Sequence, residues 1–164
     1  MINAADVQRA VFQLWEDSGL DDFLKSDWSV EDKSQFMSLS DEEASPGQPF
    51  PFCVIEFDDS FVAGRSTGGC GSWSGREYRE MPFAFNVHTK HQGLTTAKTA
   101  AREIAERIMQ VFGGHPEVKP QSLVLTHGNV LLCQYQRDYS RKTGDQEYQW
   151  VVQYNVATDV PVRL

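Results

Sequence analysis

The segment Glu147–Ala157 reads EYQWVVQYNVA and alternates between two kinds of side chain along its length. Alternate positions are aromatic or aliphatic, and the positions between them are mostly Gln and Asn. A period of two residues is typical of a β-strand whose two faces meet different surroundings. One predicted face carries Tyr148, Trp150, Val152, Tyr154 and Val156, and the other carries Gln149, Val151, Gln153 and Asn155.

The residues before this strand predict two hairpins. Leu123–Leu125 and Val130–Tyr139 are strand-like and are separated by a turn at His127–Asn129. A second turn, Arg141–Asp145 (RKTGD), leads into the final strand. Consecutive hairpins without alternation of strands and helices favour a mainly antiparallel sheet.

The clearest helix of the chain precedes these strands. Residues 95–114 read TTAKTAAREIAERIMQVFGG, with Thr95 or Thr96 as the N-cap and Gly113-Gly114 as the end. Before this helix, Arg76–Thr89 alternates in the manner of a half-buried strand. The apolar positions of the helix recur at helical spacing and predict one buried face, which consists of Ala97, Ala101, Ile104, Ala105, Ile108 and Phe112.

The first third of the chain predicts fewer regular elements. Residues 4–18 have the pattern of an amphipathic helix, which Gly19 ends. Residues 26–48 are predicted to form a polar acidic loop, and residues 58–75 a Gly-rich loop. Between them, Phe50–Phe57 is strand-like, and its two prolines are expected to keep its start out of the sheet ladder.

Together these segments predict one α+β domain over residues 1–164. Its mainly antiparallel sheet of about five strands has two main helices packed on one face, in the order α-β-β-α-β-β-β. Helices sufficient for one face leave the opposite face, or an edge, for a partner to cover.

The formal charge of −8 is unevenly distributed. Residues 16–59 hold thirteen Asp and Glu against two Lys, whereas residues 60–164 hold twelve Lys and Arg against nine Asp and Glu. This distribution argues against a general nucleic-acid binder, which needs a clustered basic face. It is compatible with a charge-complementary protein interface and also with a solvated acidic loop.

The cysteines and the N-terminal residues indicate the cellular compartment in which the protein is expected. Cys53, Cys70 and Cys133 are widely spaced and indicate reduced thiols rather than a secreted disulfide framework. The first residues lack the basic and apolar regions of a signal peptide, and no apolar run has the length of a membrane span. We therefore expect an intracellular protein without a membrane partner.

Several short motifs are reminiscent of catalytic or metal sites. Gly64–Gly68 (GRSTG) matches the nucleophile-elbow pattern, but more glycine follows it rather than a helix. His88 and His91 flank a strand end without a rigid third ligand. The acidic runs Asp41–Glu43 and Asp58-Asp59 lack the spacing of a calcium-binding loop. We expect no catalytic residue, no cofactor and no metal.

The order of these segments resembles the tail terminator family of long-tailed phages, which includes tail completion, head–tail joining and minor tail protein U-like proteins. The resemblance runs from the first helix to Ala157. The acidic segment 26–48 is longer, and the loop 58–75 richer in glycine, than that family's pattern. The resemblance is carried by the Pro-aromatic strand start at 50–55, the aromatic strand and polar link at 81–93, the Ala-rich helix at 95–113, and Arg137-Asp138 before the turn that ends at Gly144.

The resemblance implies a structural role in a phage or prophage tail or neck, with assembly in the cytoplasm and incorporation into the virion. Such proteins form a ring, commonly hexameric, that stops growth of the tail tube and joins it to the head connector, while DNA passes through the lumen. The implied partners are other copies of the chain, the tail tube protein and the head–tail connector protein. The candidate contacts are Trp73, Arg76, Arg79, Arg141 and Lys142.

Besides the uncovered face of the sheet, one further feature permits a binding role. Trp73 lies among small residues, where an aromatic side chain either anchors an interface or folds back on the sheet. The alternative function is a non-catalytic small-molecule or peptide binding domain, which an apolar pocket between helix 95–112 and the sheet would favour.

Overall fold

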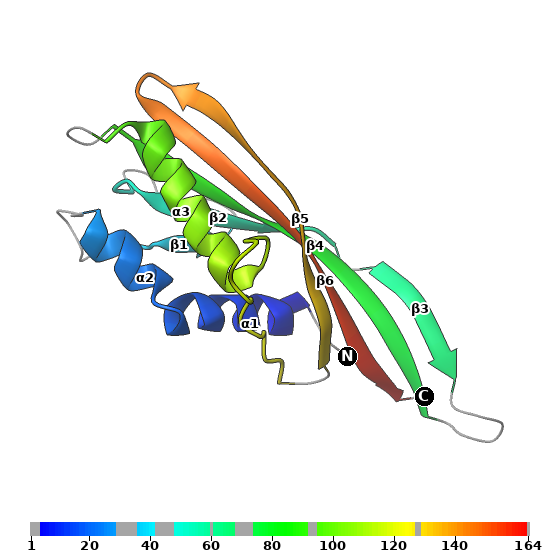
Figure 1. The fold of residues 1–164 in the computed structure, drawn as a ribbon. Helices are drawn as coiled ribbons and strands as arrows, with labels where there is room; N and C mark the ends of the chain where they lie inside the picture. Colours follow the sequence, from blue (N-terminus) through cyan, green and yellow to red (C-terminus); the bar gives the residue numbers. More distant parts are fainter. Residues whose placement is uncertain are drawn as a thin grey trace.

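The computed structural model describes residues 4–28, 36–41, 48–59, 61–67, 74–91, 95–126 and 129–163. Helices occur at the start and in the middle of the chain, and strands fill most of the remainder (Figure 1). In chain order the elements are α1 (Ala4–Asp17), α2 (Leu20–Asp22), the π-helical turn η1 (Phe23–Asp27), β1 (Leu39–Asp41), β2 (Phe52–Phe57), β3 (Phe61–Thr67), β4 (Ser74–Lys90), α3 (Ala97–Phe112), β5 (Asn129–Gly144) and β6 (Glu147–Arg163).

The two longest strands, β4 and β6, form the centre of the sheet. They pair antiparallel along their full lengths, from Ser74 opposite Arg163 to Lys90 opposite Glu147. β5 pairs with the other side of β6. On the far side of β4, β2 pairs with residues 83–88 and β3 with residues 75–80. β1 lies outside β2 and is parallel to it, so the strand order is β1-β2-β4-β6-β5, with β3 also beside β4.

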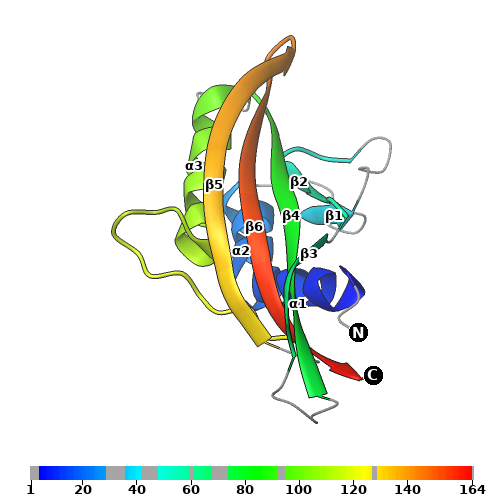
Figure 2. The same ribbon diagram turned by 90° about the vertical axis from the view of Figure 1, so that its right-hand side faces the viewer.

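The helices cover one face of this sheet, and the core lies between the two layers (Figures 1 and 2). Trp15 of α1 stacks on Phe85 of β4 with 5.6 Å between ring centroids, and Phe112 of α3 lies 4.8 Å from the same ring. Tyr154 of β6 stacks on Phe83 at 5.4 Å. Burial of these large rings is the main favourable term that joins the layers. The predicted α+β class, with a mainly antiparallel sheet and helices on one face, is confirmed.

The ends of α3 follow from its sequence. Thr96 is the N-cap, and its side-chain oxygen accepts a hydrogen bond from the Thr99 N–H at 3.3 Å. Gly113 and Gly114 have φ values of 124° and 104°, which favour glycine and end the helix. The hydroxyl of Tyr154 donates to the Gly113 carbonyl at 2.7 Å and so ties the helix end to the sheet. The predicted helix boundaries near 4–18 and 95–112 are confirmed to within two residues.

The structure corrects the predicted order of strands. Part of the predicted Gly-rich loop 58–75 is strand β3, and β4 already begins at Ser74. Leu123–Leu125 is not a strand, although Leu123 is buried, because this segment stays against the end of α3, where Gln121 N–H donates to the Val111 carbonyl at 2.8 Å. Four strands therefore precede α3 and two follow it in the described chain, instead of the predicted two and three. Antiparallel pairing with the next strand, β4, outweighs the weak local propensity of a Gly-rich segment.

The predicted acidic loop at 26–48 is described only in part. Residues 29–35 and 42–47 lie outside the described residues. Within the remainder, Leu39–Asp41 forms β1, which pairs with Cys53–Ile55. The short strand β1 therefore adds an edge strand where the sequence predicts loop.

One end of the sheet extends beyond the helices (Figures 1 and 2). This extension, here called the β-arm, consists of β3, residues 74–80 of β4 and residues 157–163 of β6. Its strands are held together by backbone pairing, whereas the other half of the sheet also has the helical layer against it. No helix of the described chain covers the far end of the β-arm (Figures 1 and 2).

Candidate assembly interface

The predicted contact residues lie at two separate places in the fold. Arg141 and Lys142 are exposed on β5, near the turn into β6, and pair with Gln149 and Tyr148. Arg79 belongs to the β-arm and pairs with Thr158. Because Thr158 and Tyr148 are ten residues apart on β6, the two places are separated by about 33 Å along the strand.

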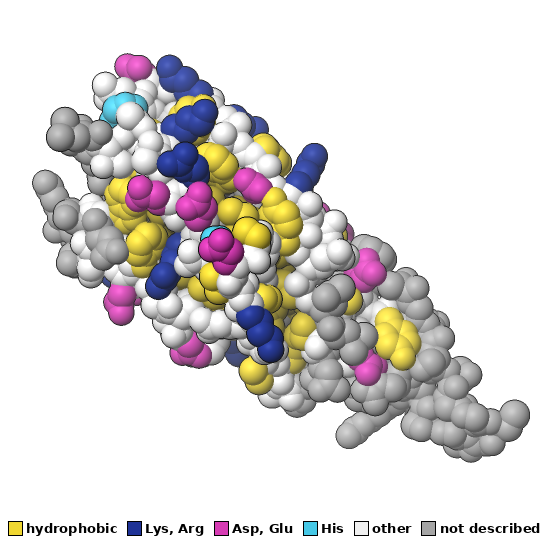
Figure 3. Space-filling view, in the orientation of Figure 1, with side chains coloured by type: hydrophobic (Ala, Val, Ile, Leu, Met, Phe, Trp, Pro, Cys, Tyr) yellow, Lys and Arg dark blue, Asp and Glu magenta, His cyan; other side chains and the backbone are white. Residues whose placement is uncertain are grey.

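The sequence also predicted contacts in the segment that precedes Arg79. Arg76 lies in the β-arm on β4, opposite Ser66 of β3 and Pro161 of β6, and belongs to the segment 76–89 that the sequence predicts as a strand. Trp73 lies outside the described residues. At the other end, several Lys and Arg side chains gather around the β5–β6 hairpin and the start of α3 (Figure 3). The predicted contact residues thus belong to two candidate surfaces, the β-arm and the hairpin end.

The face of the sheet opposite the helices, here called the outer face, carries a polar network across four strands. Arg141 Nε donates to Gln149 Oε1 at 2.6 Å, and Gln149 Nε2 donates to Asn86 Oδ1 at 3.0 Å. Asn86 Nδ2 in turn donates to the Val54 carbonyl at 3.3 Å. Gln149 and Asn86 are buried, so these bonds satisfy groups that would otherwise be costly to remove from water. The network fixes the position of Arg141 on β5.

A second set of polar pairs lies further along the same face. Arg137 Nε donates to Gln153 Oε1 at 2.6 Å, and its guanidinium carbon lies 5.3 Å from the centre of the Tyr139 ring. Asn155 Nδ2 donates to Glu80 Oε2 at 2.9 Å. The guanidinium of Arg137 is therefore held in place on β5 by a hydrogen bond and an aromatic ring.

An open groove of about 500 Å³ crosses the outer face between β2 and β5. Glu56 and Asp58 lie at its β2 side and Arg137 at its β5 side, with Ala84 and Gln153 between them. Its lining is mainly polar, which does not suit an apolar small molecule. The groove separates an acidic group of side chains from a basic one.

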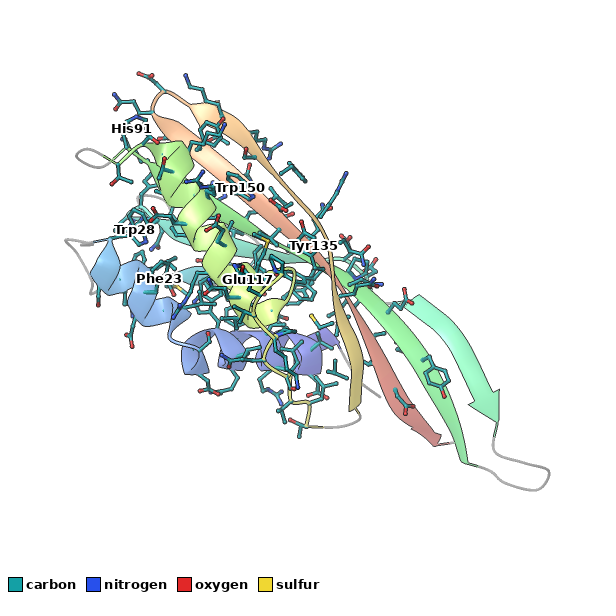
Figure 4. All side chains as sticks on the ribbon, in the orientation of Figure 1. Phe23, Trp28, His91, Glu117, Tyr135 and Trp150 are labelled. Atoms are coloured by element: carbon teal, nitrogen blue, oxygen red, sulfur yellow. The ribbon has the colours of Figure 1, made fainter. Side chains whose placement is uncertain are left out.

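On the side of β5 that faces the core, the Asp138 side chain forms two hydrogen bonds. The Asp138 carboxylate accepts a hydrogen bond from Trp150 Nε1 at 2.8 Å and another from the Tyr135 hydroxyl. Tyr135 lies on β5 and Trp150 on the neighbouring strand β6 (Figure 4). Burial raises the pKa of Tyr135 to about 12, and the bond to Asp138 adds to this shift. These groups tie β5 to β6.

The residues that are reminiscent of catalytic or metal sites have structural roles. The His88 ring stacks on Phe52 at 5.0 Å, and His91 Nδ1 accepts a hydrogen bond from the Ala97 N–H at the start of α3. Ser66 lies within strand β3 rather than on a strand-to-helix turn. Burial raises the pKa of the Cys53 thiol, which makes it a poor nucleophile. Among the described residues, no three His, Cys, Asp or Glu side chains are grouped to hold a metal ion.

Sequence reasoning missed the contributions of Arg137 and Tyr139 to the outer face. The available signal was the run of Gln and Asn at alternate positions of β6, which marked a polar face but did not identify its partners on β5. Those partners depend on the register between the strands, which shifts between Tyr135 and Arg137. No helix in the described part of the chain combines the length and the apolar character that a membrane crossing requires.

Comparison with known proteins gives one informative likeness. No protein-family model matches the chain, and no curated protein matches it. Among solved structures, the chain is similar to a chain of the structure described as "Virion of native gene transfer agent (GTA) particle". The TM-score is 0.53 at 18% sequence identity, and the match covers 95% of this chain and 96% of that chain. The two chains therefore share a fold over nearly their whole lengths.

Proposed function

We propose that this protein is a structural assembly protein of a phage-like virion, and specifically a tail terminator that forms a ring on the end of the tail tube. The observation that carries the proposal is the fold shared with a virion component over 95% of the chain. The Ala-rich helix at 95–113 and the final hairpin, which the sequence shares with the tail terminator pattern, add to the proposal. Residues 1–164 act as a single tail-terminator-like domain in this proposal.

The β-arm supports an assembly role. A few strands without a packed face are marginally stable by themselves, and unpaired strand edges are templates for contact with another chain. Arg76 and Arg79 lie on this arm. We expect the β-arm, together with Trp73, to contact the tail tube or a neighbouring subunit.

The distribution of charge supports a closed ring. A ring needs a head-to-tail contact in which two different surfaces of the same chain fit each other. Exposed acidic residues follow β2, and exposed basic residues lie on β5, across the sheet. In this arrangement the tail tube protein and the head–tail connector protein bind the two open ends of the ring, and DNA passes through it.

The alternative of a small-molecule or peptide binding domain depends on a pocket between α3 and the sheet. In the described structure most of that space is filled by buried residues, namely Phe85, Phe112 and Tyr154 together with Ile104 and Ile108. A shallow pocket of about 250 Å³ opens at the N-terminal end of α3, where Ala97 faces Tyr148 of the β5–β6 hairpin. The layers pack directly on each other, so this region favours a structural role.

The direct test is to add the purified protein to the tail tube protein of the same genetic element while the tubes polymerise. A terminator is expected to shorten the tubes and to add a ring of density at one end in electron micrographs. Bovine serum albumin at the same concentration serves as the inert control. Tubes of unchanged length with no added density at either end would contradict the proposal.

A further inference from the structure

The basic side of the outer face lies on an outer strand of the sheet. Arg137, Arg141 and Lys142 are exposed on β5, which pairs only with β6 in the described structure. Arg137 and Arg141 each use Nε to bond a glutamine of β6. A guanidinium has five N–H donors, so these bonds fix the side chains and leave most of the donors for a further partner.

The acidic side lies at the opposite edge. Glu56, Asp58 and Asp59 are exposed at the end of β2 and in the link to β3. The Asp58 N–H donates to the Pro82 carbonyl at 2.9 Å, which holds this link against β4. The three carboxylates are thus displayed at a fixed place on the sheet edge.

The two charged groups are too far apart to neutralise each other within one subunit. Three strand spacings separate β2 from β5, which corresponds to about 14 Å. This separation exceeds the screening length of about 8–10 Å at physiological salt. The charges are therefore available to a second molecule that presents the opposite sign.

The backbone at these edges is not arranged for strand addition. The pairing of β5 is interrupted by register shifts at three places, between Val130 and Leu132, between Tyr135 and Arg137, and between Lys142 and Gly144. On the opposite side, β1 is only three residues long. Bulges, charged side chains and short edge strands are common devices against edge-to-edge pairing of sheets. Contact between these edges would therefore run through side chains.

From these observations we propose that neighbouring subunits meet edge to edge, with the basic β5 edge of one copy against the acidic end of β2 in the next. The contact is heterologous, because it uses two different surfaces, and it generates a ring where its rotation closes. The inference rests on the proposed ring function and identifies the contact within it. The interface is held by ion pairs rather than by a continuous sheet, so it weakens as salt is raised.

The test uses two charge-reversed variants. Copies of the same variant repel each other at the proposed contact, whereas the two different variants attract each other there. Arg141→Glu/Lys142→Glu makes both edges acidic, and Asp58→Lys/Asp59→Lys makes both edges basic. The mass of each is measured by light scattering and sedimentation at low and high salt. We expect the wild type to rise above 18.6 kDa at low salt, each variant alone to associate at least about tenfold more weakly, and an equimolar mixture to recover association.

Matched controls reverse the same number of charges on the helical side of the molecule. Arg102→Glu/Lys119→Glu and Glu103→Lys/Glu106→Lys change exposed residues on α3 and the segment after it. These variants are expected to associate as the wild type does. Circular dichroism establishes that each variant is folded. Recovery of association in the mixture is a second check, because only folded variants can restore the contact.

Three outcomes would overturn the edge contact: variants that assemble as well as the wild type, a mixture that shows no recovery, or a wild type that stays monomeric at low salt. None of these decides the proposed function, because the tube-capping experiment tests that separately. If the wild type and both edge variants all cap the tail tube, the terminator proposal is supported and the proposed edge contact is contradicted.

Discussion

At the scale of single residues, His88 connects the outer face of the sheet to the stability of the fold. Burial lowers the pKa of its imidazole below the usual 6.5, and the nearby Arg141 guanidinium lowers it further, while Glu147 and Glu56 act in the opposite direction. The ring also stacks on Phe52. His88 is therefore a neutral packing residue in the folded state at pH 7.

This lowered pKa predicts a pH dependence of stability. The unfolded chain takes up a proton at His88 at a pKa of about 6.5, before the folded protein does. The contribution of His88 is therefore fully present above about pH 7 and is lost as the pH falls through 6.5 towards the lower folded pKa. Urea unfolding at several pH values between 7.5 and 5.5 measures this decline.

The variant His88→Gln isolates the effect. It removes the ring stacking, so its free energy of unfolding is expected to be lower than that of the wild type at every pH. Its decline between pH 7.5 and 5.5 is expected to be shallower, because the titrating group is gone. Equal slopes for both proteins would show that other groups cause the decline.

At the scale of elements, the end of α3 is fixed by a close approach to β5. A Cβ atom at Gly114 would lie 2.6 Å from Cδ2 of Tyr135, and Gly114 also has a φ of 104°. Gly19, which follows α1, has a comparable φ of 81° but nothing within 4 Å of its Cβ position. Both glycines therefore have a positive φ that disfavours other residues, but only Gly114 has a neighbouring side chain where a Cβ atom would lie.

Substitution of each glycine by alanine separates these two effects. Gly19→Ala is expected to lower the free energy of unfolding by about 1–2 kcal/mol, the cost of a left-handed conformation for a residue with a Cβ. Gly114→Ala is expected to cost about 1–3 kcal/mol more, because Tyr135 must move. Urea denaturation of both variants provides the comparison, and equal losses would mean that Tyr135 adjusts freely.

At the scale of the whole molecule, the uneven support of the sheet predicts uneven protection. Among the described elements no helix covers the far end of the β-arm, whereas residues 83–88 of β4 pack under α1 and α3 (Figure 1). Backbone amides in regions with few buried apolar contacts open at lower free energy. In the isolated subunit, β3 and residues 157–163 of β6 are therefore expected to exchange hydrogen faster than residues 83–88.

Hydrogen exchange read by mass spectrometry tests this expectation, and assembly provides the comparison state. If the β-arm is an assembly contact, its protection is expected to rise when the protein binds the tail tube, while that of residues 83–88 changes little. A β-arm that is as protected as the centre of the sheet in the free subunit would contradict the prediction.

The structural similarity to a chain of a virion is also a property of the whole molecule. It covers 95% of this chain and 96% of the other at 18% identity, so what the two share is an arrangement of layers rather than a set of side chains. An assembly protein needs such a scaffold to display edges and extensions, whereas an enzyme needs a few residues in a fixed geometry.

The sequence by itself determined the helices, the main strands and the fold class. The stripe from Ala97 to Phe112, the alternation from Phe83 to Thr89 and the alternation in β6 are local signals, because each depends only on the period of its own backbone. The limits of α3 were also local, since Thr96 and Gly113 act on the adjacent turn of helix. These features could be predicted without knowledge of any partner strand.

Only the tertiary structure decided which strands pair and which charges share an edge. β3 was hidden in a Gly-rich segment because its stability comes from pairing with β4. Leu123–Leu125 has the composition of a strand, but it pairs with no strand, and Leu123 is buried in the core. Arg141 and Lys142 could be identified from sequence as exposed basic residues, but not their position across the sheet from Asp58 and Asp59. Strand order and register depend on contacts between residues far apart in the chain, and a local period carries no information about them.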